Sequence, residues 1–218
     1  MKRHTLLSLL LALALGAAAC GEDKKNQTDQ EPPVANNDPG DAPFATSTTA
    51  QLLWKRQGAV AKDLQRALEL SPDELCSELG AAPCADVHQV PLGGNDPFIL
   101  GLYEPPHEPL STTPAVLERL VLGACVSAAE RDAQGDAKVF TELDLGSDKL
   151  DPAGEDKAAV EAQIEDLYRR LLSRDALAVE VSAVSKLATD EGGDGVSALD
   201  FAKLSCFAIG STTEFFFY

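Results

Sequence analysis

Apolar residues recur at helical intervals along most of the chain after residue 50. At the start of this region they are three or four positions apart, which predicts an amphipathic helix with Thr48 or Thr49 as its N-cap. The run Ser71-Pro72-Asp73-Glu74 combines a capping box with proline at the first helical position, so a second helix is expected there, ending near Gly80. The apolar positions of the first helix are Leu53, Val60, Leu64, Ala67 and Leu68.

Further helices are expected in the second half of the chain. One begins at Thr113-Pro114 and should be the most buried, because apolar residues cover a broad part of its surface. After a polar stretch at residues 133–156, a long amphipathic helix follows. Another is expected from Asp175 to about Thr189, and the last begins near Ser197. The apolar stripe of the long amphipathic helix consists of Val160, Ile164, Leu167, Tyr168, Leu171 and Leu172.

Residues 84–112 interrupt this helical pattern. Val87-His88-Gln89-Val90 is consistent with a short extended piece, and three prolines within 105–109 exclude a helix, so we expect a long ordered surface loop. The run Phe215-Phe216-Phe217-Tyr218 is expected to close the core, although an exposed run would be a docking patch. Together these patterns predict an all-α fold at residues 51–218, with one compact domain of about five to six helices and one long irregular loop.

Residues 1–19 have the three-part pattern of an export signal, in which positive residues precede an apolar stretch and small residues. The apolar stretch is too short to span a bilayer, for which about 20 residues are needed. The run Leu15-Gly16-Ala17-Ala18-Ala19-Cys20 resembles the bacterial lipobox, which implies cleavage before Cys20 and a covalent lipid, with palmitate-type acyl chains, on that cysteine. Gly21 after the cysteine implies, by comparison with Gram-negative sorting, an anchor in the outer membrane. We expect the protein to face the periplasm. The alternative is a secreted protein with a chance cysteine at the cleavage site.

Residues 20–50 hold four prolines, six acidic residues and a single aromatic residue, which predicts a disordered acidic tether with a reach of roughly 30 Å. The whole chain has a formal net charge of −17, and removal of the signal would make it more acidic. This charge argues against nucleic-acid binding and against attraction to anionic lipid, so the acyl chains rather than the protein surface would hold the membrane. Solubility is the simplest role of the charge, and a basic partner or loosely bound divalent cations are the alternatives.

Four cysteines remain besides Cys20, and an even number in an oxidising compartment indicates two disulfides with three possible pairings. We favour Cys76–Cys84, which closes a short loop, and Cys125–Cys206, which ties two distant helices together. Zinc is the competing use of four cysteines. However, the sequence has no CxxC pair, and the compartment disfavours free thiolates.

The last third of the chain resembles the ending of a family of uncharacterised secreted bacterial proteins that often accompany c-type cytochrome domains. The resemblance is carried by Leu167-Tyr168-Arg169-Arg170-Leu171-Leu172-Ser173-Arg174-Asp175, by Glu180 and by Thr212-Thr213-Glu214-Phe215. Residues 84–218 also resemble a set of uncharacterised outer-membrane lipoproteins. These resemblances imply a helical fold and an electron-transfer neighbourhood, and they bring no catalytic residue.

Candidate chemistry is sparse. His88 and His107 lie in the irregular segment near several carboxylates, so they are weak candidates for a metal site or a non-covalent haem ligand, or else they are surface and loop-packing histidines. The sequence contains no nucleophile elbow, P-loop or HExxH motif. We therefore expect no cofactor and no catalytic residue, and predict a non-enzymatic accessory or interaction module of the cell envelope with a possible protein partner. The alternative is a redox- or metal-linked accessory protein that acts near c-type cytochromes through the two histidines.

Overall fold

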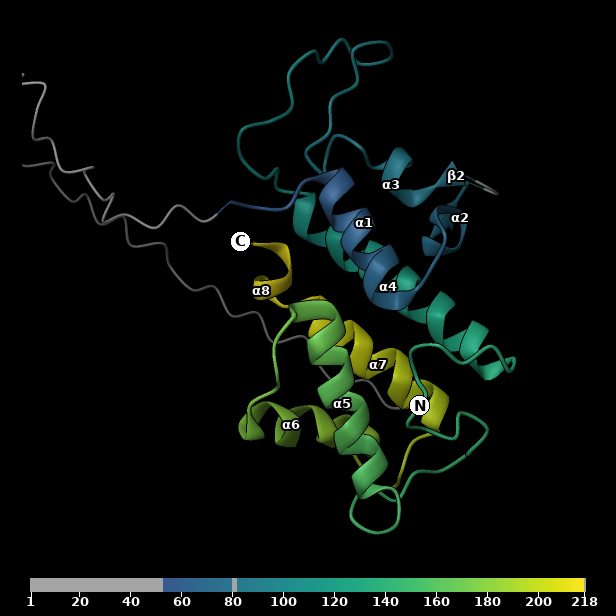
Figure 1. Ribbon diagram of the computed structural model, residues 1–218. Coiled ribbons are helices and arrows are strands. Elements are labelled where there is room, and N and C mark those ends of the chain that lie inside the picture. Colours follow the sequence, from purple (N-terminus) through teal and green to yellow (C-terminus); the bar gives the residue numbers. More distant parts are fainter. Residues whose placement is uncertain (1–52, 80–81, 218) are drawn as a thin grey trace, which may run out of the picture. The chain divides into compact units, whose positions relative to one another are not determined.

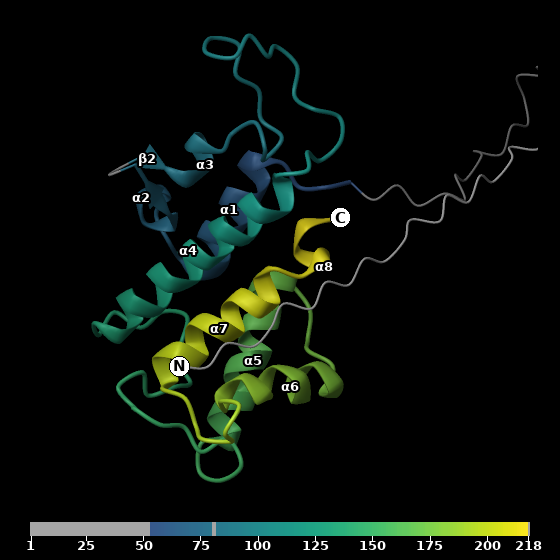
Figure 2. The same ribbon diagram turned by 180° about the vertical axis from the view of Figure 1, so that it is seen from behind.

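Helices α4 (Thr113–Ala133) and α7 (Ala198–Gly210) form the centre of the fold. The computed structural model describes residues 53–79 and 82–217, and in this part α7 packs along α4 (Figure 2). Their backbones approach closely, because a methyl group placed on Gly210 would lie only 2.8 Å from Val121 Cγ1. The buried apolar residues of α4 beyond its first turn are Leu117, Leu120, Val121, Ala124, Cys125, Ala128 and Ala129.

One side of this pair is covered by the elements nearest the start of the described chain. Helix α1 (Gln57–Leu68) packs on α4, and so does the short helix α2 (Pro72–Leu75) (Figure 1). Strands β1 (Ser77–Glu78) and β2 (Ala82–Pro83) then form a small antiparallel ladder, which leads into α3 (Cys84–Val87). The ladder is therefore a small local element beside a helical core.

The other side is covered by α5 (Lys157–Leu172), which contacts α1, α6 and α7. Helix α6 (Ala178–Ser185) continues into the 3-10 turn η1 (Lys186–Ala188), and α8 (Thr213–Phe216) packs on α5. The predicted all-α class is confirmed. The described residues hold five helices of eight residues or more, and the three others, α2, α3 and α8, have four residues each.

Three local predictions are wrong. The second helix ends at Leu75 rather than near Gly80, because Ser77 and Glu78 pair with Pro83 and Ala82 in the ladder. The first helix begins at Gln57 rather than after Thr48 or Thr49, and Leu53 is 53% exposed and lies before the helix. The residues that precede α1 pair instead with the chain end, because the Lys55 N–H donates to the Phe216 carbonyl at 2.7 Å. The expected extended piece at residues 87–90 is helix and turn, and the His88 N–H donates to the Cys84 carbonyl at 2.9 Å.

Both favoured disulfides are confirmed. Cys76–Cys84 brackets the β1–β2 ladder with a Cα–Cα distance of 5.4 Å, and Cys125–Cys206 joins α4 to α7 with a Cα–Cα distance of 5.7 Å. The four sulfur atoms are bonded in two pairs, so they offer no thiolate to zinc.

The terminal aromatic run closes the core, as predicted. Phe215 and Phe216 are buried and Phe217 is half-buried, while Tyr218 lies outside the described residues. The predicted signal at 1–19, the lipid site Cys20 and the tether at 20–50 also lie outside the described residues. Within the described part of the chain, no helix is long and apolar enough to cross a membrane.

Candidate interaction site

A long loop, residues 94–112, projects from the end of the molecule where α1 and α4 begin (Figure 1). Its base is fixed to both helices. The Gln57 N–H donates to the Leu92 carbonyl at 2.6 Å, and the Thr113 hydroxyl donates to the Pro91 carbonyl at 2.5 Å. The same hydroxyl accepts the Leu110 N–H at 2.9 Å. The loop therefore leaves and rejoins the helical core at defined points.

The tip of the loop is a closed turn built on Asp96. The Asp96 carboxylate accepts the backbone N–H groups of Phe98 at 3.2 Å and Ile99 at 2.9 Å. The Asp96 carbonyl accepts the N–H of Leu102 at 2.9 Å, and the Asn95 side-chain amide donates to the Tyr103 carbonyl at 3.2 Å. Three backbone donors of the tip are thus satisfied internally, so a partner that covers the tip would not leave them without acceptors.

The side chains of this turn are apolar and exposed. Phe98 is 96% exposed, Ile99 85% and Tyr103 77%, and Leu100 and Leu102 are also exposed. Such residues normally enter the core, and exposed apolar residues gathered in one place mark a site of interaction. We call Phe98–Tyr103 the apolar tip. Sequence reasoning found the loop but not the tip, although the signal was present as five apolar residues within the six that follow Asp96-Pro97.

The apolar tip lies within an acidic part of the sequence. Residues 67–118 contain no lysine and no arginine. Asp96 lies two residues before the tip, Glu104 follows it directly, and Glu108 comes later on the same loop. The acidic residues of the whole stretch are Glu69, Asp73, Glu74, Glu78, Asp86, Asp96, Glu104, Glu108 and Glu118.

The two candidate histidines are not assembled into a metal site. His88 Nε2 lies 3.1 Å from Glu78 Oε2, which links the end of α3 to β1. The Arg119 guanidinium of α4 contacts the same carboxylate. His107 is exposed on the loop. Among residues 53–79 and 82–217, the one group of three potential ligands within reach of one another is Cys76, Glu78 and Cys84, in which the two sulfurs form a disulfide.

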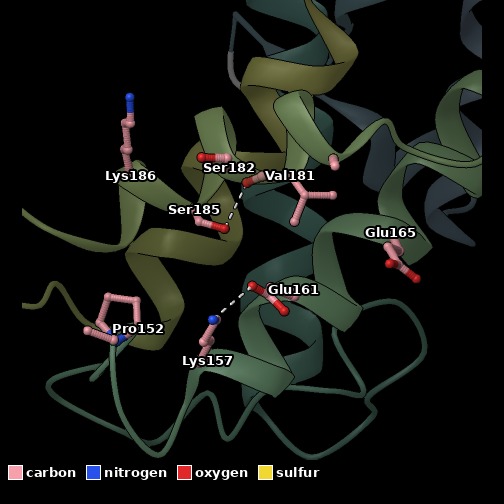
Figure 3. Close-up of a pocket in the computed structure, with 10 residues that line it drawn as sticks. Pro152, Lys157, Glu161, Glu165, Val181, Ser182, Ser185 and Lys186 are labelled. Atoms are coloured by element: carbon pink, nitrogen blue, oxygen red, sulfur yellow. Dashed lines mark hydrogen bonds and ion pairs between the residues drawn. The ribbon is translucent and has the colours of Figure 1, made fainter.

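A surface cavity of about 570 Å³ lies between α5 and α6 and has mixed charge (Figure 3). Lys157 and Glu161 face each other at 3.9 Å on its wall, and Lys186 lies on the opposite side. The Ser185 hydroxyl donates to the Val181 carbonyl at 2.8 Å. No histidine lines this cavity, so its serines have no imidazole base, and the geometry does not match nucleophilic catalysis.

Three of the residues on which the expected family resemblance rests form an ion-pair network, namely Arg174, Glu180 and Glu214. The Arg174 guanidinium binds the Glu180 carboxylate with two bonds of 2.8 Å and the Glu214 carboxylate with two bonds of 2.7 Å, and it lies 5.1 Å from the Tyr168 ring centroid. The bonds from Arg174, followed by the Leu177 N–H, lower the pKa of Glu180 to about 2. Bonds from the same arginine lower the pKa of Glu214, while burial raises the pKa of Tyr168. The network ties α5, α6 and α8 together, and none of its members lines the cavity between α5 and α6.

Comparison with protein families, with curated proteins and with solved structures finds no match to this chain.

Proposed function

We propose that the protein is a membrane-anchored lipoprotein of the bacterial cell envelope that acts as a non-enzymatic interaction module. The apolar tip is its binding epitope for a protein partner. The observation that carries this proposal is the exposure of Phe98, Ile99 and Tyr103 on an internally hydrogen-bonded turn. A lipid on Cys20 would hold the module to the outer membrane, and residues 20–50 would serve as its tether.

The construction of the tip favours binding. Its turn is already ordered by Asp96, so the partner does not have to order a flexible segment when it binds. Aromatic side chains at the centre of an interface supply much of its affinity, and Phe98 and Tyr103 are placed for this role. Burying one large apolar side chain contributes about 2 kcal/mol, so two or three of them at the tip suffice for a specific but weak contact.

The charge around the tip indicates the chemistry of the partner. An acidic loop favours a partner whose apolar groove is rimmed by lysine and arginine, because opposite charges accelerate the encounter and exclude wrong partners. A second copy of this chain has a net charge of −17 and would be repelled. Anionic lipid would be repelled in the same way.

Site-specific photo-crosslinking tests the epitope. A benzophenone amino acid would replace Phe98 or Ile99 in the native lipoprotein, and Val179 on α6, which is also highly exposed, is the matched control position. We expect one discrete protein adduct from positions 98 and 99 and none from position 179. The crosslinked partner should have a basic surface. Adducts of equal yield at all three positions, or no adduct at the tip, would contradict the proposal.

The anchor has its own test. Intact-mass analysis of the processed protein should give a chain that begins at Cys20 and carries fatty-acid mass. A mature chain that begins elsewhere, or one without lipid, contradicts the anchor and leaves the epitope untouched.

A further inference from the structure

A small cleft lies at the base of the loop, between the residues that precede α1, the start of α4, and α8. Its volume is about 230 Å³. Three aromatic side chains belong to its lining, those of Trp54, Phe216 and Phe217, and Leu117 adds an aliphatic one. Trp54 is 9% exposed and Phe216 8%, so these walls are held in place by the core and do not form an open patch.

The charge of the cleft is negative. Among the described residues that line it, Glu118 is the one that carries a charge. The surrounding sequence has the same sign, because residues 67–118 contain no lysine and no arginine. Lys55, next to Trp54 in the chain, is not part of the lining, and its ammonium group pairs with Asp63 at 2.9 Å. An anionic ligand would therefore be repelled, and a cation would be attracted.

Aromatic rings together with a carboxylate are the groups that recognise an organic cation. The face of an aromatic ring is negative and attracts an ammonium group. A metal ion would lose its water in an apolar cleft at a large cost, whereas a methylated ammonium group has little water to lose. The same aromatic cluster already holds a cation, since the Lys55 ammonium lies 4.5 Å from the ring centroid of Phe215. That ring packs edge to face on Phe216, with centroids 5.4 Å apart.

We infer that this cleft binds a small organic cation with an alkylated ammonium head, such as a trimethylammonium compound. The head packs among the aromatic side chains, and the Glu118 carboxylate supplies the opposite charge. A cavity of about 150 Å³ holds benzene, so a cleft of about 230 Å³ has room for choline, which has one non-hydrogen atom more than benzene. The site does not depend on the apolar tip, so its failure would leave the proposed epitope standing.

A free compound is favoured over a lipid headgroup that carries the same ammonium group. In phosphatidylcholine a phosphate follows the ammonium after two carbons, and near this cleft it would meet Glu118 and the acidic loop. Like charges brought together in this way are unfavourable. We therefore expect that vesicles of phosphatidylcholine do not displace bound choline, and displacement by such vesicles would overturn the assignment to a free compound.

Choline and 3,3-dimethylbutan-1-ol form the test pair, because they have the same shape and differ by one positive charge. The sample is the full mature chain with Cys20→Ser, exported behind a cleavable signal so that its disulfides form. Binding is followed by the fluorescence of Trp54, the only tryptophan of the chain, and by the methyl signals of Leu117 in carbon–proton correlation spectra. We expect choline to bind saturably and at least about tenfold more tightly than the alcohol.

Variants separate the contributions of charge, ring and space. Glu118→Gln removes the charge and Phe217→Leu removes one ring, and each should weaken choline binding about three- to tenfold while the affinity for the alcohol changes less than about twofold. Glu104→Gln, on the loop but outside the lining, is the matched control and should change neither affinity. Ser211→Phe and Thr213→Phe each fill the cleft and should abolish binding of both compounds.

Circular dichroism checks that each variant is folded. Equal affinities for choline and the alcohol, or equal effects of Glu118→Gln and Glu104→Gln, would overturn the inference. Choline binding that survives both filling variants, or no saturable response to choline, would overturn it as well.

Discussion

The strongest stability prediction concerns Asp132, a buried carboxylate near the end of α4. Its side chain is fully buried and accepts the backbone N–H groups of Val139 and Phe140, each at 2.8 Å, and of Lys138 at 3.1 Å. The Arg131 guanidinium also donates to it at 2.6 and 3.0 Å. Asp132 thus holds the chain that leaves α4 in a tight turn over the core.

The size of the effect follows from the donors that a substitution leaves unpaired. Asp132→Ala deprives two fully buried N–H groups, those of Val139 and Phe140, of their acceptor. At about 1 to 3 kcal/mol for each buried donor, the free energy of unfolding should fall by about 4 kcal/mol. Asp132→Asn keeps one oxygen for the backbone but loses the charged bonds with Arg131, so it should cost about 2 kcal/mol. Asp136→Asn, on the exposed turn nearby, is the control and should cost less than about 0.5 kcal/mol.

The pKa of Asp132 determines how its contribution to stability changes with pH. Burial by itself would raise the pKa of Asp132, but the bonds from Phe140, Val139, Arg131 and Lys138 outweigh burial and lower it. A carboxylate with a lowered folded pKa stabilises the protein above its unfolded pKa of about 3.9, and this stabilisation is lost as the pH falls through the folded pKa. Urea unfolding of the lipid-free mature chain should therefore show a difference between wild type and Asp132→Asn that is constant from pH 7 to 5 and shrinks toward pH 3. Equal stability at pH 7, or a difference that does not change in acid, would refute the reasoning.

Other predictions follow from the remaining contacts. Arg174→Met should lower the free energy of unfolding by about 1 to 2 kcal/mol at pH 7 in urea titrations. This loss should shrink as the pH falls from about 4 toward 2, because the pKa values of Glu180 and Glu214 are lowered only in the folded state. A loss that stays unchanged at low pH would contradict a stabilising role of the ion-pair network. Replacing Cys125 and Cys206 by serine should lower the free energy of unfolding by about 4.5 kcal/mol, and the same change at Cys76 and Cys84 by about 2.5 kcal/mol. The difference arises because the Cys125–Cys206 bond closes the longer loop. Chemical unfolding would measure both losses, and a larger loss at Cys76 and Cys84 would contradict this prediction. Phe98→Ser combined with Ile99→Ser should leave the free energy of unfolding within about 0.5 kcal/mol of that of the wild type. The double change should reduce the fluorescence of a bound apolar dye, whereas Val179→Ser should not reduce it. A large loss of stability would mean that the tip packs on the core.

The helices could be predicted because their signals are local. The Glu74 carboxylate accepts the Ser71 N–H at 2.8 Å, as the capping box requires, and Ser197 caps α7 by accepting the Asp200 N–H at 3.1 Å. The start of α1 was placed wrongly because the deciding contact is not local. The segment around Lys55 pairs with Phe216, a residue from the far end of the chain, and helical periodicity carries no information about such a pairing.

The loop and the nearby disulfide of the candidate site were also predicted from local signals, whereas the exposure of its apolar tip was not. Proline spacing predicted a loop at residues 84–112, and loop length predicted the Cys76–Cys84 bond. Whether apolar residues in a loop fold back onto the core is decided by tertiary contacts that no pattern encodes. In this protein Asp96 closes the turn locally, so the tip keeps its own hydrogen bonds and stays outside the core. The His88 side chain was equally undecidable, because its partner Glu78 lies on a ladder that sequence patterns did not predict.

The reach of the proposed tether fits the small size of the apolar tip. A tip of a few exposed side chains gives a weak contact, and a weak contact in free solution would be rarely occupied. A tether with the predicted reach of roughly 30 Å would confine the domain to a layer near the membrane, where a partner in the same membrane would be met at an effective concentration of the order of millimolar. Weak binding then gives high occupancy together with fast release. The acidic surface fits this arrangement, because it keeps identical domains apart in that crowded layer while the tip stays available. On this argument Cys20→Ser should lower the crosslink yield at Phe98 in cells although it leaves the tip unchanged, since the proposed lipid would contribute local concentration and no contact.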